Sequence, residues 1–191
     1  MVTFVTRLEA ALASRTPRRI DRPGSRRAAV AVLLTAERDP AILFIKRKER
    51  AGDPWSGQMA LPGGFVAATD ASLADAARRE TAEETGIGLS DPRWLLGALD
   101  DVSPRSAYLP PLVVTPHVFL VPERLTATPG PEVDAAVWLR VADLYDPALR
   151  SRFSLTLGGV ARDFEAIVVG GYTIWGLTER VLQQLGALAE T

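Results

Sequence analysis

Three glutamates that lie close together in the sequence could hold a divalent metal ion. Glu80, Glu83 and Glu84 belong to one short segment, and positions three and four apart share one face of a helix. Like charges on one helix face repel each other, so this face needs a compensating partner. A hard cation such as Mg²⁺, which binds carboxylates together with substrate phosphates, would provide it. The neighbouring Arg78 and Arg79 could offset part of the repulsion instead.

The sequence around these glutamates favours a metal site over the alternative, a solvated helix face. Gly63 and Gly64 lie shortly upstream and follow Pro62. Because glycine has no Cβ, its backbone can approach a metal ion or a phosphate closely. A backbone carbonyl from this turn beside helix carboxylates would form an all-oxygen site, the ligand set typical of Mg²⁺ and Mn²⁺.

The segment from Gly64 to Ile87 resembles the box of the Nudix family. The usual box reads Gly, five residues, Glu, seven residues, and then Arg-Glu-apolar-x-Glu-Glu-x-Gly-apolar. Residues 79–87 read Arg-Glu-Thr-Ala-Glu-Glu-Thr-Gly-Ile, so the half that carries the glutamates is intact. This sequence departs in three ways: Asp70 replaces the first Glu, the following spacer is one residue longer, and Thr81 replaces an aliphatic residue.

The resemblance implies a fold and a metal site. Nudix proteins form an α/β/α sandwich around a mixed β-sheet, and residues 61–87 would form the box region here. Arg79 would orient a glutamate through a charge-assisted hydrogen bond, and Asp70 would support the start of the helix behind the ligands. The resemblance assigns these metal ligands: Glu80, Glu83, Glu84 and the carbonyl of Gly63.

The same resemblance implies hydrolysis of a nucleoside diphosphate that is linked to another group. Mg²⁺ or Mn²⁺ suits this reaction, because these ions neutralise charge on the diphosphate and activate a water molecule. The residues implied in catalysis are Glu83, Arg79 and Glu84. The box does not assign the group that takes the proton from water. Glu83 is the first candidate for this role, and the more distant candidates are Glu123, Glu132, Asp163 and Glu165.

Two further segments resemble the coenzyme A diphosphatases within the Nudix family. Residues 57–64 are similar to a Gly-x-x-x-Phe-Pro-Gly-Gly segment, with Leu61 in place of Phe, and residues 174–178 are similar to Ile-Trp-Gly-x-Thr. This resemblance implies cleavage of coenzyme A or a thioester into 3′,5′-adenosine diphosphate and a 4′-phosphopantetheine fragment. Asp53 stands where that signature has an arginine. The alternatives are another substrate (ADP-ribose, a dinucleoside polyphosphate or an oxidised nucleotide) or a non-catalytic nucleotide-binding module.

Four residues near the box are candidates for substrate binding: Arg47, Arg50, Trp55 and Gly64. The two arginines could hold a 3′-phosphate such as that of coenzyme A, although exposed arginines without a ligand are also common. Trp55 could stack on adenine, flank a pantetheine arm, or only pack its own loop. The single histidine, His117, lies in an apolar segment and is expected to be a core residue.

The hydrophobic pattern predicts strands and helices in alternation around these residues. Residues 1–27 are expected to form an amphipathic helix and a basic connector, and residues 47–60 a loop. The box helix is expected to start at Ser72 and to end at Gly86. The alternation favours one α/β domain over residues 1–191, around a mixed sheet. Strands are expected at 28–34, 42–46, 94–99, 112–120, 137–139 and 164–169, and further helices at 141–149 and 175–188.

Composition excludes several classes of protein. The chain has 191 residues, 47% of them hydrophobic, and no cysteine, which excludes disulfides and thiolate metal sites. A net charge of −1 argues against wrapping nucleic acid, which needs a basic surplus. No apolar run reaches the roughly 18 residues of a membrane span, and Arg7 and Glu9 interrupt the first apolar stretch. The sequence predicts a cytoplasmic protein with a small nucleotide substrate, and a homodimer is possible because Nudix proteins often dimerise.

Overall fold

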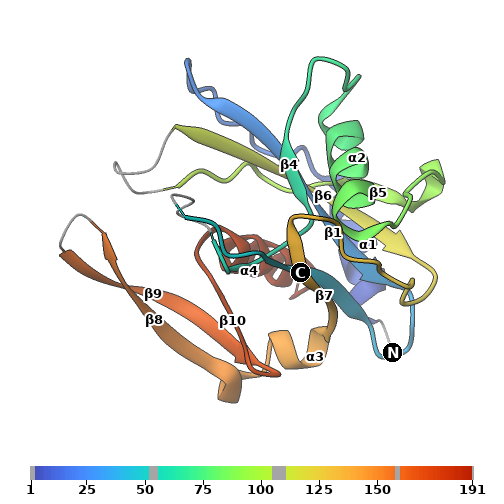
Figure 1. Cartoon of the computed structure of the whole chain (residues 1–191). Helices are drawn as coiled ribbons and strands as arrows, with labels where there is room; N and C mark the ends of the chain where they lie inside the picture. The colour runs from blue at the N-terminus through green and yellow to red at the C-terminus, as the bar shows by residue number, and fades with distance from the viewer. Residues whose placement is uncertain (1–2, 52–55, 105–110, 158–159, 191) are drawn as a thin grey trace.

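The computed structural model describes residues 3–51, 56–104, 111–157 and 160–190. These residues form a seven-stranded mixed sheet, a three-stranded antiparallel sheet and the helices that pack on them (Figure 1). The helices are α1 (Phe4–Ser14), α2 (Leu73–Thr85), α3 (Val141–Leu144) and α4 (Gly176–Glu190), with 3-10 turns η1 (Pro92–Trp94) and η2 (Pro147–Leu149). The strands are β1 (Arg26–Thr35), β2 (Ala41–Arg47), β3 (Met59–Ala60), β4 (Gly63–Phe65), β5 (Leu95–Ala98), β6 (Leu112–Val121), β7 (Val133–Arg140), β8 (Arg150–Leu157), β9 (Val160–Val169) and β10 (Tyr172–Trp175).

The seven-stranded sheet is built around β1. Its main order is β3-β2-β1-β6-β5, with β4 paired to β1 and β7 paired to β2. The β1–β6 pair is parallel, and the other pairs are antiparallel. The short strand β4 pairs with the first half of β1, where Gly64 lies opposite Ala29 and Phe65 lies opposite Ala28. This pairing holds the two glycines of the box against the centre of the sheet.

Helices cover both faces of this sheet. Successive side chains of a strand point to opposite faces, so the even and odd residues of β1 enter different cores. Val32 and Leu34 pack with residues of α1 and α4, including Leu8. Ala29 and Ala31 pack on the other face with the alanines of α2. The expected α/β/α sandwich around a mixed sheet is therefore confirmed.

The box helix α2 begins and ends as predicted. The Ser72 hydroxyl accepts a hydrogen bond from the backbone N–H of Asp75, and Gly86 ends the helix with φ 69°. Left-handed backbone of this kind favours glycine. Thr81 is fully buried, and its hydroxyl donates to the carbonyl of Ala77 at 2.7 Å. This bond satisfies the polar group that Thr81 places at a usually aliphatic position.

A second sheet, formed by β8, β9 and β10, shares no strand pairing with the seven-stranded sheet (Figure 1). It packs beside α4, and β10 contacts β3 of the larger sheet. Trp175, at the end of β10, anchors this sheet. Its ring stacks on Phe153 of β8 at 4.5 Å between centroids and contacts Phe164 of β9 at 5.1 Å. The first residues of α4 follow Trp175 directly, so the same aromatic cluster sets the direction in which α4 leaves the small sheet.

The basic connector after α1 is fixed to the fold by two aspartates. Asp100 and Asp101 follow β5, and the side chain of Asp101 is fully buried. The backbone N–H groups of Arg18 and Ile20 donate to Asp100 and Asp101 respectively. Four arginines form ion pairs with these two carboxylates: Arg15, Arg18, Arg19 and Arg27.

Several predicted boundaries were wrong. The expected loop 47–60 ends in β3, and the two glycines lie in β4 rather than in a turn. Strand β7 begins at Val133, while β8 and β10 were not predicted. The expected helix 141–149 is split into α3 and η2, because proline at position 147 cannot continue a helix.

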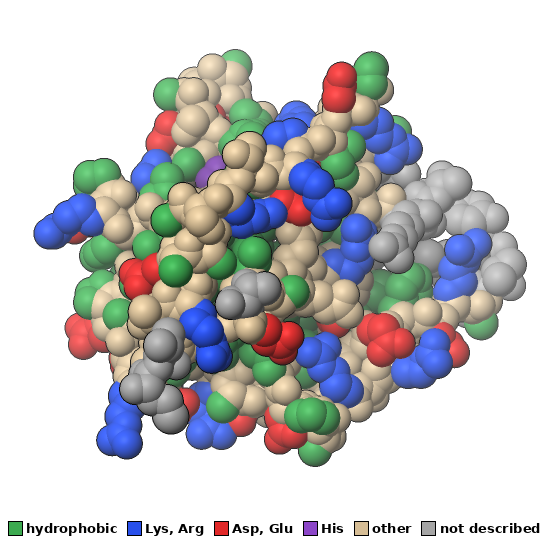
Figure 2. All heavy atoms as spheres, turned by 180° about the vertical axis from the view of Figure 1, so that it is seen from behind, with side chains coloured by type: hydrophobic (Ala, Val, Ile, Leu, Met, Phe, Trp, Pro, Cys, Tyr) green, Lys and Arg blue, Asp and Glu red, His purple; other side chains and the backbone are tan. Residues whose placement is uncertain are grey.

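His117 agrees with a further expectation. His117 lies buried in β6, and burial lowers its pKa to about 4, so it is a neutral core residue, as expected. Among the described residues, no helix is long and apolar enough to cross a membrane. Figure 2 shows acidic and basic side chains interspersed over one face, without a continuous basic surface on that side.

Candidate functional site

Two of the three glutamates of α2 contact the two glycines of β4. Glu84 is buried, with 8% of its surface exposed, and it accepts a hydrogen bond from the backbone N–H of Gly63 at 2.8 Å. Glu80 lies against Gly64, where an added Cβ would come within 2.5 Å of its carboxylate. Glu83, one turn along, is exposed. Glycine at position 64 is therefore what allows Glu80 to sit on the strand.

Arg79 ties the acidic side chains of the box together. Its guanidinium binds Asp70 through two hydrogen bonds of 3.0 and 3.1 Å. It also donates to Glu80 at 2.8 Å and to Glu83 at 3.2 Å, and to the carbonyl of Phe65 at 3.0 Å. Hydrogen bonds between charged groups are stronger and more directional than neutral ones. Arg79 therefore orients two of the three glutamates.

Asp70 supports Arg79 from behind. Its side chain is only 4% exposed, and it accepts a hydrogen bond from the backbone N–H of Ala67 at 2.7 Å. The hydrogen bonds from Arg79, followed by that from Ala67, hold the pKa of Asp70 below its usual value. Asp70 therefore stays ionised and fixes the position of the Arg79 guanidinium.

Two other carboxylates of the site, Glu84 and Glu80, behave in the opposite way. Burial is the main cause that raises the pKa of Glu84 to about 7, and the hydrogen bond from Gly63 only partly opposes it. Burial also raises the pKa of Glu80, against the effect of Arg79. Two carboxylates are therefore held where their negative charge is incompletely compensated, a condition that a bound cation relieves.

The donor set fits a hard divalent cation, although it is not assembled as a metal cage. Within the described residues, no group of three acidic or histidine side chains converges on one point. Instead, Glu80 and Glu83 share the guanidinium of Arg79, and Glu84 faces Gly63. All the side-chain donors are carboxylate oxygens, which Mg²⁺ and Mn²⁺ prefer.

The turn before β7 closes the carboxyl end of α2. The backbone N–H of Gly130 donates to the carbonyl of Glu84 at 2.8 Å, and a Cβ at Gly130 would lie 2.2 Å from the carbonyl oxygen of Glu83. Glu132, in the same turn, pairs with Arg50 at 3.1 Å and contributes to the raised pKa of Glu84. Glu132 is thus the distant base candidate that lies next to the glutamates.

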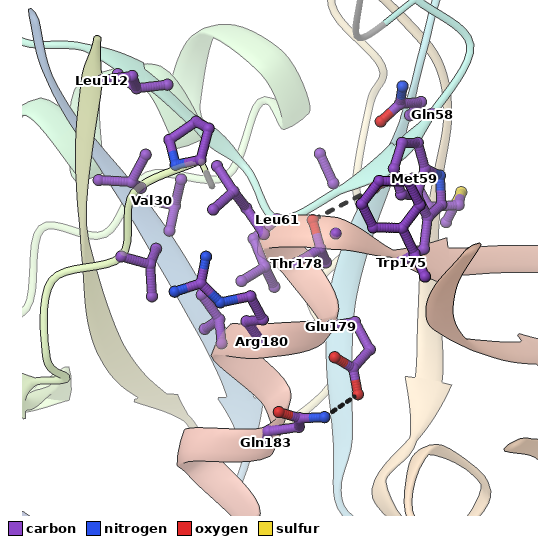
Figure 3. A pocket seen from close by; sticks show the side chains of 18 of the residues that line it. Val30, Gln58, Met59, Leu61, Leu112, Trp175, Thr178, Glu179, Arg180 and Gln183 are labelled. Atoms are coloured by element: carbon purple, nitrogen blue, oxygen red, sulfur yellow. Dashed lines mark hydrogen bonds between the residues drawn. The ribbon is translucent and has the colours of Figure 1, made fainter. Parts of the chain in front are cut away.

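A cleft of about 860 Å³ extends from the two glycines to α4 and β9. Gly63, Gly64 and Arg47 line one end of it. Its walls are mostly apolar, and Figure 3 shows Val30 and Leu112 on one side and Trp175 on the other. The hydroxyl of Thr178 on α4 donates to the carbonyl of Met59 at 3.4 Å (Figure 3), which joins α4 to β3 across the cleft.

The structure separates the predicted substrate-binding residues. Arg47 and Gly64 line the cleft, whereas Arg50 is held by Glu132. Trp55 and Asp53 lie outside the described residues. Asp163 and Glu165 also line the cleft, at its β9 side, and Glu123 is exposed after β6. The three glutamates of α2 are not among the lining residues, but Glu80 and Glu84 contact the two glycines, which are.

One buried acid of the cleft was missed in the sequence. The side chain of Glu179 on α4 is 3% exposed and pairs with Arg150 at 3.0 Å, while Gln183 donates to it at 2.8 Å. A signal was present, because Glu179 lies three residues before Leu182 and so on the buried face of the helix. A single acid within an apolar stripe indicates a buried charge that needs a partner.

Comparison with known proteins identifies the family. The sequence model of the NUDIX domain matches residues 25–157, which span β1 to β8 and include all of α2. The chain therefore belongs to the Nudix family.

Similarity to one relative extends beyond the matched domain. An uncharacterised Nudix hydrolase of Yersinia enterocolitica, NudL, is 31% identical over 164 residues, which cover 84% of this chain and 80% of that protein. An uncharacterised protein of Schizosaccharomyces pombe is 38% identical over 123 residues, or 61% of this chain. The chain aligns with only 36% of the length of that second relative.

Solved structures share the fold. A MutT/nudix family protein from Enterococcus faecalis matches with a TM-score of 0.60 and 19% identity, over 99% of this chain and 70% of that chain. The NUDIX domain of NrtR from Shewanella oneidensis, solved with ADP ribose, matches with a TM-score of 0.52 and 24% identity, over 71% and 84% of the two chains. At these identities the likeness concerns the fold.

Proposed function

We propose that this protein is a metal-dependent hydrolase that cleaves the diphosphate of coenzyme A or of its thioesters. The products would be 3′,5′-adenosine diphosphate and a 4′-phosphopantetheine fragment or its acyl form. The observation that carries this proposal is the meeting of two distant segments in one cleft. Residues 57–64 and 174–178 both resemble coenzyme A diphosphatases, and members of both line the 860 Å³ cleft.

The shape of this cleft suits the proposed substrate. Its end at Gly63, Gly64 and Arg47 offers backbone that can approach closely and a cation for a diphosphate. Most of the remaining wall is apolar, with Leu61 and Trp175 among the lining residues. A pantetheine arm is long and weakly polar, and it would bury more of this wall than a second nucleotide or a ribose would.

The glutamates of α2 would hold the metal. Glu80, Glu83 and Glu84, with the carbonyl of Gly63, would bind Mg²⁺ or Mn²⁺, which when bound neutralises diphosphate charge and lowers the pKa of a water molecule. Arg79 would keep Glu80 and Glu83 in place through the hydrogen bonds that it already forms.

Hydrolysis then requires a group that removes a proton from water. Water attacks a phosphorus atom, the bridging phosphorus–oxygen bond breaks, and we assign the proton to Glu83. Its side chain is 60% exposed, so it can exchange a proton with solvent. Glu84, in contrast, is buried and accepts a hydrogen bond from the backbone N–H of Gly63. Glu132, on the neighbouring turn, is the second candidate.

A substrate panel tests the proposal. Coenzyme A, an acyl thioester of it, ADP-ribose, a dinucleoside tetraphosphate and an oxidised nucleoside triphosphate would each be incubated with Mg²⁺ or Mn²⁺, and the products identified by mass spectrometry. We expect 3′,5′-adenosine diphosphate from the first two, and no turnover with a chelator. Rapid cleavage of ADP-ribose beside intact coenzyme A would overturn the substrate assignment. The absence of turnover on every compound would favour a nucleotide-binding module.

A further inference from the structure

A cation stacks on an aromatic ring at the edge of the cleft. Phe65 directly follows the two glycines, and 37% of its surface is exposed although the residue is large and apolar. The guanidinium of Arg26 lies over this ring, 3.3 Å from its centroid. Arg26 opens β1, on the same face as Ala28, which pairs with Phe65. Arg26 lies outside the Nudix box, and Phe65 occupies one of its unspecified positions.

The ion pairs of the neighbouring arginines distinguish Arg26 from them. Arg27, next in sequence, and three arginines of the connector, Arg15, Arg18 and Arg19, bind Asp100 or Asp101. Arg22 donates a hydrogen bond to the hydroxyl of Ser103. Arg26 is exposed, and within the part of the chain that the structure describes it forms no ion pair with a carboxylate. Its charge is therefore available to an anion from solvent, and the ring beneath it restricts the positions that the guanidinium can take.

The position of this pair connects it to the catalytic residues. Phe65 lines the cleft, and its carbonyl accepts a hydrogen bond from Arg79 at 3.0 Å. Its Cα lies about 4 Å along the chain from that of Gly64, which touches Glu80. Leu112, the register neighbour of Arg26 in β6, also lines the cleft. A phosphate at Arg26 would thus be near the cleaved diphosphate and separate from it.

We infer that Arg26, held against Phe65, binds a phosphate of the substrate other than the diphosphate that is cleaved. This inference rests on the proposed function, in which that group is the 3′-phosphate of the adenosine. Arginine suits the role because its planar guanidinium can donate two parallel hydrogen bonds to phosphate oxygens. Arg26 is then a specificity residue, which distinguishes a 3′-phosphorylated nucleotide from one without that group.

Equilibrium binding of two nucleotides tests this inference without turnover. One is adenosine 3′,5′-bisphosphate, the proposed product called 3′,5′-adenosine diphosphate above, and the other is AMP, which lacks the 3′-phosphate. Calorimetry would measure adenosine 3′,5′-bisphosphate and AMP with the wild type, Arg26→Ala, Arg26→Lys and Phe65→Leu. We expect the wild type to bind the bisphosphate about tenfold more tightly than AMP. Arg26→Ala should reduce this preference to about twofold or less, because AMP lacks the group that Arg26 contacts. Arg26→Lys and Phe65→Leu should give intermediate preferences. The first keeps the charge and loses the two parallel donors, and the second keeps the guanidinium and loses the ring beneath it.

Arg38→Ala is the matched control. Arg38 is exposed in the turn after β1, at the opposite end of the strand from Arg26, and its removal changes net charge equally. The preference should be unchanged in this variant. A wild type without a preference, an equal loss of both ligands in Arg26→Ala, or the same loss in Arg38→Ala would overturn the inference. The substrate panel reports separately on the proposed function, since it identifies the bond cleaved whatever Arg26 does.

Discussion

At the scale of single residues, the site combines carboxylates in opposite electrostatic states. The pKa of Asp70 is lowered by Arg79, whereas burial raises the pKa of Glu84 to about 7. Asp70 is therefore ionised at neutral pH, and Glu84 is poised between its two forms. A cation that binds to Glu84 must displace a proton at or below that pH, so metal affinity is expected to rise as pH increases through 7.

Replacement of Glu84 by glutamine should lower the activity of the enzyme but raise the stability of the metal-free protein. We expect Glu84→Gln, like Glu83→Gln, to lower kcat by about a hundredfold or more, because each substitution removes a proposed metal ligand. Without metal at pH 8, Glu84→Gln should instead raise the free energy of unfolding by about 1–3 kcal/mol. The wild type loses stability as pH rises through the folded pKa of about 7, since the usual value is 4.5.

Activity assays and urea unfolding of both variants check these expectations, with the exposed Glu190→Gln as a control that should change neither quantity. Unchanged kcat in Glu83→Gln or Glu84→Gln would remove that residue from the mechanism. A metal-free Glu84→Gln protein less stable than the wild type at pH 8 would show that the buried charge is compensated.

Gly64→Ala should weaken metal binding more than it weakens folding. The added Cβ would meet the carboxylate of Glu80 at 2.5 Å, so this side chain has to move, which it can do because its end is flexible. We expect the metal concentration needed for half-maximal activity to rise about tenfold, with little change in Tm. Gly88→Ala is the control, since a Cβ there meets nothing within 4 Å. Equal metal requirements in the two variants would contradict the role given to Gly64.

The grouping of the three glutamates could be predicted because they lie on one helix, and their roles stay predictions. Helical spacing placed Glu80, Glu83 and Glu84 on one face, and the box resemblance supplied Gly63 and Arg79. The contacts themselves could not be predicted, since they depend on how β4 pairs with β1. The stacking of Arg26 on Phe65 joins two strands far apart in sequence, and no local pattern marks such a pair.

At the scale of elements, ion pairs hold the connector between α1 and β1 against the turn that follows β5, residues 99–104. The two aspartates of this turn, Asp100 and Asp101, pair with four arginines: Arg15, Arg18, Arg19 and Arg27. On the other side of this turn, Arg180 of α4 donates to the carbonyl of Ser103 at 2.8 Å, and Gln184 donates to that of Asp100 at 3.4 Å. Val102 and Pro104 of the same turn line the cleft, so the connector stabilises one wall of the cleft.

Asp101→Asn should destabilise the fold in a pH-dependent way. Burial opposes ionisation of Asp101, but hydrogen bonds from Ile20, Thr115 and Arg19 outweigh it and lower its pKa below the usual 3.8. Because Arg19 and Arg27 are partly exposed, we expect a loss of about 2 kcal/mol at pH 7. The stabilisation is present above pH 4 and is lost as pH falls through the lowered pKa.

Urea unfolding at pH 7 and pH 3 measures this difference between the wild type and Asp101→Asn, which should shrink at the lower pH. Asp134→Asn is the control, since its pair with Lys46 is exposed and should contribute less than about 1 kcal/mol. A difference that stays constant with pH would show that packing, and not charge, explains the loss.

The elements show where sequence patterns fail. Strand β8 alternates apolar and polar residues, with Phe153 and Leu155 between more polar neighbours, so its signal was present but was not recognised. Strands β3 and β4 are two and three residues long, too short for a pattern. Their conformation comes from pairing with β2 and β1, a tertiary effect. The same holds for the parallel pairing of β1 with β6.

At the scale of the whole molecule, two sheets enclose the cleft and α4 joins them. Residues of β9 and α4 face residues of β1 and β6 across the cleft. Trp175 holds the small sheet through Phe153 and Phe164. The stability of this sheet should therefore depend on one aromatic cluster, whereas the seven-stranded sheet is packed by helices on both faces.

Trp175→Ala should loosen the small sheet alone. Loss of the stacked ring should lower the free energy of opening of the small sheet by about 1–3 kcal/mol. Amide hydrogen exchange should therefore become faster in β8 and β9, while β1 and β6 stay protected. Hydrogen exchange followed by mass spectrometry measures this directly. Trp94→Ala is the control, because Trp94 packs in the core on the α2 side and should affect α2 instead. Uniformly faster exchange in Trp175→Ala would show that the two sheets unfold together.

The boundary of the Nudix match has a consequence for how recognition could diversify. The match ends at residue 157, so β9, β10 and α4 lie beyond it although they form one whole side of the cleft. Under the proposed function, part of the ligand-selecting surface is therefore encoded apart from the metal-binding segment, whereas Arg26 and Arg47 lie within the matched domain. Exchange of the segment from β9 to α4 between such proteins would change one wall of the cleft while Gly63, Gly64 and the glutamates of α2 stay the same.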